Sequence, residues 1–464
     1  MIADVGAVVV AVEGELLLFA GVFFLLGALD ELLIDLGYLW LRLSGRSKRI
    51  APPLTPSASL SAPVAVLIPA WQEALVIGTT VRHALAVWPQ AQVTLYVGCY
   101  FNDPATVAAV RAIGGDSRIR LIVHDISGPT CKADCLNRIY AAMCADEVGR
   151  GENYRFVVLH DAEDMVDAAA LSLMDQAIGR ADFVQLPVLA LPQHGSRWIG
   201  GHYSDEFAEA HGRTMVVRSA LCAALPGAGV GCAIERNMLA RLAARRSGAG
   251  PFNVGSLVED YELGLMVARL GGKAEFLRVR TEGGGLVATR AYFPSTLQAA
   301  VRQKTRWTHG IALQGWDRLG WQGNFIDRYM LLRDRRGPLS ALLLALGYLL
   351  FAALAGSYIL ALAGVGAGFT FTCWMQGLLA ANLGLLGWRA VWRGALTWRE
   401  HGWRQGLLAI PRIVISNIIA IMAGWRALAA YCRSLRGEQP RWDKTEHHLH
   451  PATELLPEPE KLAA

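Results

Sequence analysis

The run from Pro338 to Val365 carries no charged residue and is long enough to cross a lipid bilayer as a helix. Thr370 to Leu386 is a second uncharged run, and a short glycine-rich turn separates the two. Basic residues crowd beside the apolar runs, at 42–49, 333–336 and 389–404. Such flanks are typical of the cytoplasmic loops of membrane proteins. The sequence therefore predicts a multi-pass membrane protein.

The N-terminal segment predicts one more membrane helix. Leu16 to Leu29 is apolar but too short to span alone, and its extensions contain carboxylates such as Glu13 and Asp35. Carboxylates at that depth are costly unless they face other protein or the interface. We expect one uncleaved helix with a basic flank within residues 1–50, because no basic region or cleavage site of a removed signal peptide is present.

The third apolar stretch of the C-terminal part, Gly406 to Tyr431, contains a proline and two arginines. The tail 432–464 carries several basic residues, and the positive-inside rule favours a cytoplasmic tail. We therefore predict two full spans within 338–431, with 406–431 lying in the interface or re-entering the bilayer. The segment 311–337 is predicted to be an interfacial helix.

Composition excludes several classes of function. Hydrophobic residues make up 53% and charged residues 18%, which fits a protein that is part soluble and part membrane-embedded. The net charge is only +5, so no nucleic-acid partner is predicted. The eight cysteines include no Cys-x-x-Cys pair, so neither a zinc site nor a disulfide framework is expected. His447, His448 and His450 are interpreted as a solvated tail rather than a metal site.

The segment 63–310, which follows a linker at 51–62, alternates short β-rich runs with helix-like segments. This spacing predicts an α/β domain with a mainly parallel sheet and helices on both faces. Ligands bind such sheets at the carboxyl ends of the strands. The predicted strands are Val64–Pro69, Gln92–Gly98, Ile119–His124, Tyr154–Asp161 and Phe183–Pro187.

Two acidic clusters stand where such a site would lie. His160 to Asp164 follows a buried strand, and its Asp161 and Glu163 are suited to hold Mg²⁺ or Mn²⁺ together with substrate phosphates. A solvated acidic loop is the alternative. Glu259 and Asp260 open a helix, where the dipole stabilises acids, so the pair is either a helix cap or a candidate general base.

Four more residues have binding chemistry. Lys132 lies at a predicted helix start, against the dipole, which suggests an anionic ligand there; a surface lysine is the alternative. Gln303, Arg306 and Trp307 span about one helical turn, with a donor fork for a diphosphate and a flat face for a sugar ring. An amphipathic interfacial helix would give the same spacing. Gly227–Gly231 lacks the dinucleotide spacing and is expected to let a substrate approach the backbone closely.

In this order the motifs resemble those of membrane-bound, processive family 2 glycosyltransferases, which include cellulose, chitin and hyaluronan synthases. The segments that carry the resemblance are Ile68–Glu73, Lys132–Asn137, Asp161–Glu163, Val258–Asp260 and Gln303–Trp307. The first aspartate motif of the family, Asp-Asp-x-Ser-x-Asp, is missing from this sequence. Val97–Tyr100 stands in its place, and Asp103 is the nearby acidic residue that remains. The pattern from Gly98 to Thr106, together with His160–Asp164, is most similar to the bacteriophage adsorption protein B subgroup, and we expect this chain to lack the cyclic-di-GMP-sensing domain that members often carry.

The resemblance implies a GT-A type nucleotide-sugar-binding domain and a role for each residue. Asp161 and Glu163 would hold Mg²⁺ or Mn²⁺, and Asp260 would be the general base, with Glu259 beside it. The substrate-binding residues would be Glu73 and Asp103 near the nucleoside, with Lys132, Asp161, Gln303, Arg306 and Trp307. Trp442–His447 faintly resembles a gating segment that covers the substrate.

The resemblance also implies a place and partners. We expect a bacterial inner membrane protein with a cytoplasmic catalytic domain, a nucleotide-diphosphate sugar donor such as a UDP-sugar, and contact with membrane lipid. The predicted acceptor is a growing polysaccharide, with a possible export or outer-membrane partner protein. Two alternatives stay open: transfer of a single sugar to a lipid acceptor, and a non-catalytic membrane scaffold with a degenerate site.

Overall fold

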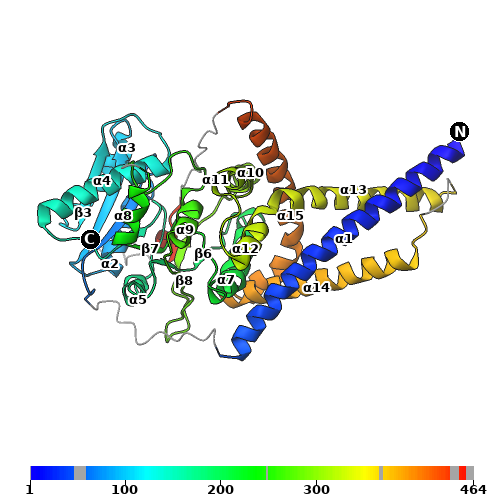
Figure 1. The fold of residues 1–464 in the computed structure, drawn as a ribbon, viewed down its shortest axis with the longest axis horizontal. Coiled ribbons are helices and arrows are strands. Elements are labelled where there is room, and N and C mark those ends of the chain that lie inside the picture. Colours follow the sequence, from blue (N-terminus) through cyan, green and yellow to red (C-terminus); the bar gives the residue numbers. More distant parts are fainter. Residues whose placement is uncertain (1, 46–58, 247–248, 365–368, 439–448, 456–464) are drawn as a thin grey trace, which may run out of the picture.

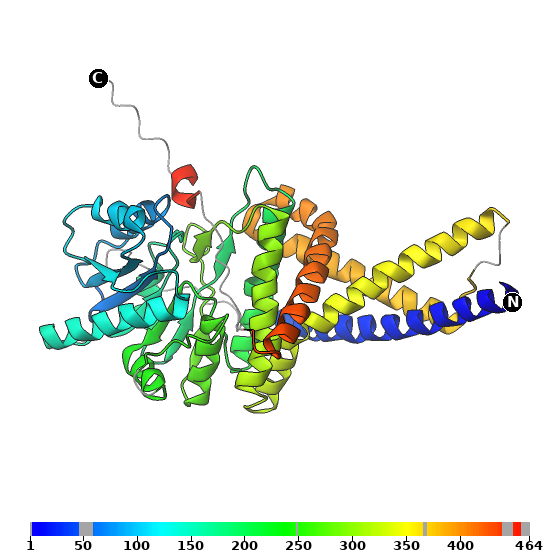
Figure 2. The same cartoon turned by 90° about the horizontal axis from the view of Figure 1, so that it is seen from above.

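A computed structural model of the chain describes residues 2–45, 59–246, 249–364, 369–438 and 449–455. An α/β domain lies at one end, and a group of long helices projects away from it at the other (Figure 1). The N-terminus lies at the far end of these helices, as the view from above also shows (Figure 2).

The α/β domain is built on a mixed, mostly parallel sheet with the strand order β3-β2-β1-β4-β7-β5-β8. Its strands are β1 (Val64–Pro69), β2 (Val93–Tyr100), β3 (Ile119–His124), β4 (Phe156–Leu159), β5 (Phe183–Gln185), β7 (Cys232–Glu235) and β8 (Ala274–Phe276). β7 is antiparallel to both of its neighbours, and the other pairs are parallel. The strands β6 (Val188–Ala190) and β9 (Thr289–Ala291) pair in a second, parallel sheet. The predicted fold class is confirmed.

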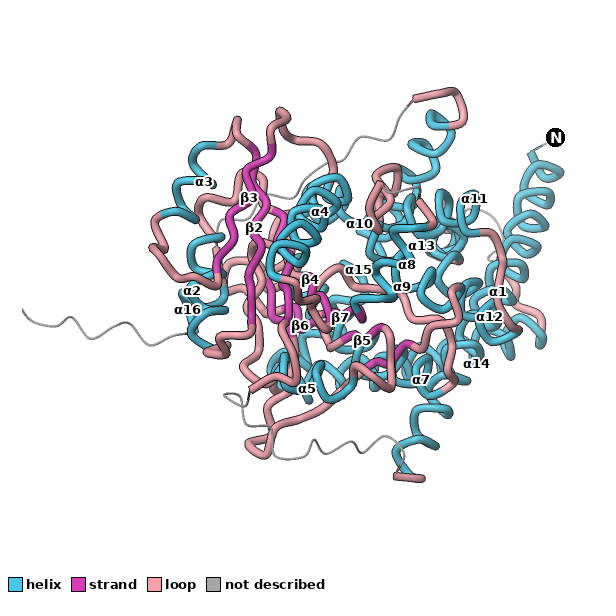
Figure 3. Tube along the Cα trace, turned by 60° about the vertical axis from the view of Figure 1, so that its left-hand side comes forward, coloured by secondary structure: helices cyan, strands magenta, loops and turns pink. Residues whose placement is uncertain are grey.

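Helices bury both faces of the sheet, as the tube view shows (Figure 3). Along β1, Val64, Val66 and Ile68 join one apolar cluster, while Ala65 and Leu67 join a second on the other face. Near-continuous apolar strands are typical of such two-sided burial. The first cluster contains side chains of α2 (Ile77–Val87), α3 (Pro104–Arg111) and α5 (Ala170–Ala177), and the second contains side chains of α4 (Lys132–Arg150), α8 (Arg236–Ala244) and α9 (Glu259–Arg269).

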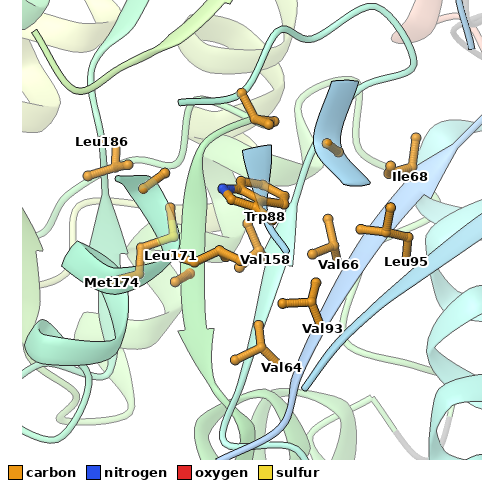
Figure 4. Packing of buried hydrophobic residues seen from close by; sticks show 14 of the residues in the cluster. Val64, Val66, Ile68, Trp88, Val93, Leu95, Val158, Leu171, Met174 and Leu186 are labelled. Carbon is orange, nitrogen blue, oxygen red and sulfur yellow. The ribbon is translucent and has the colours of Figure 1, made fainter. Parts of the chain in front are cut away.

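Trp88 fixes the end of α2 against the sheet. Its side chain is 1% exposed and lies among side chains of β1, β2 and β4 such as Val66 and Val158 (Figure 4). The indole N–H donates to the carbonyl oxygen of Asp167 at 3.0 Å, so the buried polar atom is satisfied. Packing on this face therefore holds the loop that follows β4.

The long helices form two groups. α1 (Ile2–Leu43), α13 (Gly337–Leu362) and α14 (Cys373–His401) run away from the domain, and α15 (Trp403–Ser434) lies across their base (Figures 1 and 2). By length and composition, α1 over Val10–Leu43, α13 and α15 are each able to cross a membrane. α14 is not among these candidate spans, although it contains residues 373–386 of the predicted span 370–386. The number of spans therefore remains a prediction.

Carboxylates of α1 contact arginines instead of lipid. Asp30 pairs with Arg333 and Arg336, and Asp35 pairs with Arg213. Arg213 lies on η1 (Ala210–Thr214), a π-helical turn between α6 (Ile199–Glu209) and α7 (Met215–Ala220). Asp30 and Asp35 thus face other protein, as their sequence position required, whereas Glu15 is exposed on the helix surface.

The single helix predicted over 311–337 is wrong, because the segment is divided. After α10 (Leu297–Thr308), the chain continues through η2 (His309–Gln314) and α11 (Gly315–Leu319), and α12 begins anew (Phe325–Arg335). Gly320 and Gly323 between them have φ values of +57° and +107°, which glycine adopts most readily. Asn324 then caps α12 in a capping box with Asp327.

The segment 449–455, with α16 (Pro451–Leu455), packs back on the α/β domain. His450 is 2% exposed, and its Nε2 lies 3.3 Å from the carbonyl oxygen of Asp164. The interpretation of a solvated histidine is therefore wrong for His450. His447, His448 and the segment Trp442–His447 lie outside the described residues.

Candidate active site

A cavity of about 440 Å³ opens at the carboxyl ends of β1 and β4 and the N-termini of α4 and α9. Every site residue expected from the sequence lines it except Asp103. These lining residues are Glu73, Lys132, Asp161, Glu163, Glu259, Asp260, Gln303, Arg306 and Trp307. The structure thus brings together motifs that lie far apart in the chain.

The acidic loop after β4 places three carboxylate residues along the cavity, and one of them, Asp164, is buried and bound within the loop. Asp164 is 1% exposed, accepts a hydrogen bond from the Asp161 backbone N–H at 2.9 Å and lies 2.9 Å from His160 Nδ1. Burial raises the pKa of Asp164, and the contact with His160 opposes this shift. Asp164 thus lines the cavity together with Asp161 and Glu163, but its side chain is held by His160 and by the loop backbone.

Lys132 at the start of α4 is the cation between the acidic clusters. Its Nζ lies 2.6 Å from Asp161 Oδ1 and 3.8 Å from Glu259 Oε1. Burial lowers the pKa of Lys132, but the charges of Asp161, Glu259 and Asp260 outweigh burial and raise it. These carboxylates explain why a lysine is tolerated at a helix N-terminus. We call Lys132, Asp161, Glu163, Glu259 and Asp260 the charged wall.

Glu259 and Asp260 form the first turn of α9. Glu259 is 6% exposed, and burial together with the charge of Asp260 raises its pKa to about 7, against the opposing charge of Lys132. Asp260 Oδ1 accepts from the Tyr261 backbone N–H at 2.8 Å. The pair therefore combines one carboxyl buried among charges with one that points along the cavity edge.

The glycine segment 227–231 packs against Asp260. A Cβ at Gly227 would lie 2.6 Å from the Asp260 carbonyl oxygen, and one at Gly229 would overlap Asp260 Oδ2. Gly229 also has a φ of +80°, which disfavours other residues. The sequence predicted that a substrate would approach the glycine backbone here. In the structure, the group that packs against Gly227 and Gly229 is Asp260.

The helix α10 carries Gln303, Arg306 and Trp307 into the cavity. Arg306 Nη1 donates to the Leu257 carbonyl oxygen at 3.3 Å, which ties α10 to the segment before α9. Trp307 contacts the rings of Phe207 and Phe293 at centroid distances of 6.4 and 6.5 Å. We call Phe207, His211, Phe293 and Trp307 the aromatic wall; all four line the cavity.

Asp103 lies beneath the cavity rather than in its lining. It caps α3, with Oδ1 accepting from Thr106 N at 3.3 Å, and its Oδ2 accepts from Gln72 N at 2.6 Å. Gln72 has a φ of +53° and stands between Trp71 and Glu73, which both line the cavity. The geometry gives Asp103 a positioning role in this loop, and direct contact with a nucleoside remains a prediction.

The family model described as "Glycosyltransferase like family 2" matches residues 62–310. The chain belongs to this family. Its members transfer sugars from nucleotide-sugar donors, and the matched residues cover the predicted domain 63–310. The match therefore includes all residues of the charged wall and of the aromatic wall.

Curated relatives extend the similarity into the membrane helices. The chain is 33% identical over 416 residues to Bacteriophage adsorption protein B of Escherichia coli strain K12 and to Bacteriophage N4 adsorption protein B of Escherichia coli O157:H7. Each match covers 84% of this chain and 55% of the relative, so the chain spans about half the length of these relatives.

One solved structure supports the GT-A-like fold over most of the chain. A mannosyltransferase from Pyrobaculum calidifontis, solved with GDP-Man and Mn²⁺, superposes with a TM-score of 0.52 at 18% identity. The superposition covers 87% of this chain and 99% of that protein.

Asp161 and Glu163 have the ligand chemistry of a divalent-cation site. Among the described residues, no group of three or more His, Cys, Asp and Glu side chains is placed to hold a metal ion. Mg²⁺ commonly takes one or two carboxylates and completes its shell with substrate phosphates and water. Asp161 and Glu163, two of the carboxylate residues that line the cavity, match that requirement, and their role as metal ligands remains a prediction.

Several residues that line the cavity were not predicted from the sequence to contact a ligand. Trp71 and Tyr100 form an edge-to-face pair at 5.3 Å, and Asp334 accepts a hydrogen bond from the Tyr261 hydroxyl at 2.8 Å. Tyr100 belongs to Val97–Tyr100, the segment that stands in place of the missing first aspartate, and this departure was the available signal. Asp334 lies in a basic flank and gave no signal, because its partner is distant in the chain.

Proposed function

We propose that this glycosyltransferase is inverting and moves a sugar from a nucleoside diphosphate to a growing polysaccharide at the inner membrane. The observation that carries the proposal is the shared cavity: Asp161 and Glu163, Asp260, and Trp307 all line one space. A diphosphate, an acceptor hydroxyl and a sugar ring would each meet a suitable group there.

The reaction is a single displacement at the anomeric carbon. Asp260 takes the proton of the acceptor hydroxyl while its oxygen forms the new bond to the anomeric carbon. The bond from that carbon to the diphosphate oxygen breaks at the same time, and the nucleoside diphosphate leaves from the opposite face. Attack from one face with departure from the other inverts the centre.

The remaining residues bind and orient. Lys132 and Arg306 face the departing negative charge, and Trp307 holds the acceptor sugar against its ring. Trp71 and Tyr100 would flank the nucleobase of the donor, with Glu73 close to the nucleoside. A Mg²⁺ or Mn²⁺ ion held by Asp161 and Glu163 would neutralise charge on the diphosphate.

Asp260→Asn tests the proposal most directly. We expect a loss of transfer on the order of 10²- to 10⁴-fold, because the amide takes no proton, with the donor Kd changed less than about threefold. The assay is transfer of radiolabelled sugar from a panel of UDP- and GDP-sugars on purified membranes. Asp125→Asn, whose carboxylate side chain is 88% exposed, is the matched control. Normal turnover by Asp260→Asn would remove Asp260 as the base.

Transfer of one sugar to a lipid is the second candidate. It is favoured by the packing of α10, which carries Trp307, on the long apolar helix α15. Product size separates the two functions: polymer supports the first, and a lipid with a single sugar supports the second. No transfer from any donor, with no nucleotide binding, would favour a scaffold role.

A further inference from the structure

His211 lines the cavity but has no part in the proposed displacement. It lies on the π-helical turn η1 and is 8% exposed. Its ring contacts Phe207 edge to face at 5.2 Å, and Phe207 in turn contacts Trp307. His211 therefore continues the surface on which Trp307 would hold the acceptor.

The backbone of β6 fixes which nitrogen of His211 carries the proton. The Val188 N–H donates to Nδ1 at 2.8 Å, while the Val188 carbonyl oxygen lies farther from Nδ1, at 3.3 Å. The N–H is satisfied only if Nδ1 keeps its lone pair, so the neutral ring has its proton on Nε2. Nε2–H is then the one polar group that the ring has left to offer a ligand.

The surroundings keep this ring uncharged near neutral pH. Burial lowers the pKa of His211 to about 4, with the charge of Arg278 acting in the same direction and the contact with Val188 opposing it. Lys304, three residues before Trp307, is bound to Glu206, and the adjacent Arg306 donates to the Leu257 carbonyl oxygen. The aromatic wall thus offers ring faces and a neutral donor.

The π-helical turn explains how His211 reaches the cavity. Such turns interrupt an α-helix and are frequent at functional sites. Two residues after His211, Arg213 pairs with Asp35 and Glu31 of α1. One turn therefore directs a neutral ring into the cavity and anchors its own backbone to the first long helix.

We propose that His211 is a specificity-determining residue whose Nε2–H donates a hydrogen bond to a hydroxyl of an uncharged acceptor sugar. The proposal rests on the proposed transferase function and chooses between its two acceptors. A sugar ring presents C–H faces to aromatic rings and a hydroxyl to Nε2, whereas a phosphate placed on these four rings would be desolvated against apolar faces and a neutral donor, which is costly. The proposed acceptor end is accordingly a sugar rather than a phosphorylated lipid head.

Two amide substitutions separate the two nitrogens. In His211→Asn the side-chain oxygen can replace Nδ1 and accept from Val188, but no donor reaches the position of Nε2. In His211→Gln the amide reaches that position and restores a donor. We expect His211→Asn to raise the acceptor KM about threefold to tenfold, the usual range for one hydrogen bond, and His211→Gln to recover most of this loss. The increase falls on the acceptor KM rather than on the donor KM.

The exposed His194 gives the matched control, since His194→Asn should leave both KM values unchanged. Melting temperatures of the purified variants in detergent show whether each is folded. If a variant does not fold, wild-type enzyme is compared on a sugar acceptor and on acceptors that lack one hydroxyl each. One of these deoxy acceptors should show the same threefold to tenfold loss.

Three results would overturn the proposal. Equal losses in the Asn and Gln variants would make His211 a packing residue, and a change confined to the donor KM would place it beside the nucleotide sugar. Higher kcat/KM for a phosphorylated lipid than for a sugar would reject the acceptor class. A wild-type protein that transfers sugar from no donor would instead reject the proposed function itself.

Discussion

The charged wall and the aromatic wall of the cavity are built in different ways. The charged wall stands at the end of β4 and the starts of α4 and α9, and its groups are coupled through Lys132. The aromatic wall is assembled from α6, η1, α10 and the segment after β9 through many ring contacts. Loss of one charge leaves several carboxylates uncompensated, whereas loss of one ring removes a contact among several.

Lys132→Met should have the largest effect, because it removes the cation shared by Asp161 and Glu259. Breaking one side of a buried ion pair costs about 3–5 kcal/mol, and the variant should lose transfer by at least about 100-fold. Thermal unfolding in detergent and the radiolabel assay measure the two effects. Lys273→Met, at an exposed position, is the control. An active, stable Lys132→Met would show that the charged wall is not coupled.

Gly229→Ala should follow, with a loss of transfer of roughly 100-fold. The new Cβ would overlap the Asp260 carboxylate and displace it from the cavity edge, and a displacement of about 1 Å can cost that much. Gly271→Ala separates this clash from backbone strain, because Gly271 has a similar φ of +76° with nothing within 4 Å of its Cβ. Equal losses in both variants would assign the effect to strain alone.

The charged wall could be predicted because each of its residues follows a strand or opens a helix. A buried run such as Phe156–Leu159 predicts a strand, and the carboxyl ends of parallel strands meet at one edge. The sequence could not tell that Asp164 turns inward to His160, since this depends on how the loop closes. The resemblance assigned Asp103 to the ligand, but it could not show that the carboxylate also binds the backbone of the neighbouring loop.

The aromatic wall was missed apart from Trp307. Phe207 and Phe293 lie far apart in the sequence, and alone each has the pattern of an ordinary core residue. The short strands β6 to β9 were missed as well, because three or four residues carry little periodicity. β7 is also antiparallel in a sheet whose spacing indicates parallel strands. Contacts between distant segments, rather than local pattern, decide both features.

The charged wall should also make stability depend on pH in a defined direction. The pKa of Glu259 is raised from 4.5 to about 7 by burial and by Asp260, so the folded protein holds this proton more tightly than the unfolded chain. Its contribution to stability is full below about pH 4.5 and is lost as pH rises through 7. Glu259→Gln mimics the protonated group, so its stability should differ from wild type by less than about 1 kcal/mol at pH 5 and should be clearly higher at pH 8. At about 1.4 kcal/mol per unit of pKa, the gain approaches about 3 kcal/mol.

Melting temperatures of the two proteins at pH 5 and pH 8 provide the measurement. A Glu259→Gln difference of the same size at both pH values would contradict a raised pKa. Glu152→Gln, at an exposed position, corrects for the general loss of one negative charge.

The aromatic wall should respond least to a single change. Phe293→Leu removes a ring stacked on Tyr203 at 4.9 Å and in contact with Phe207 at 4.6 Å, yet Phe207 and Trp307 remain in contact with each other. Aromatic pairs contribute about 0.5–1.5 kcal/mol beyond their buried area, so the acceptor KM should rise about twofold to tenfold. Phe101→Leu, at a side chain 54% exposed, is the control. A loss as large as that of Lys132→Met would mean that the rings act as one coupled unit, and the contrast between the two walls would disappear.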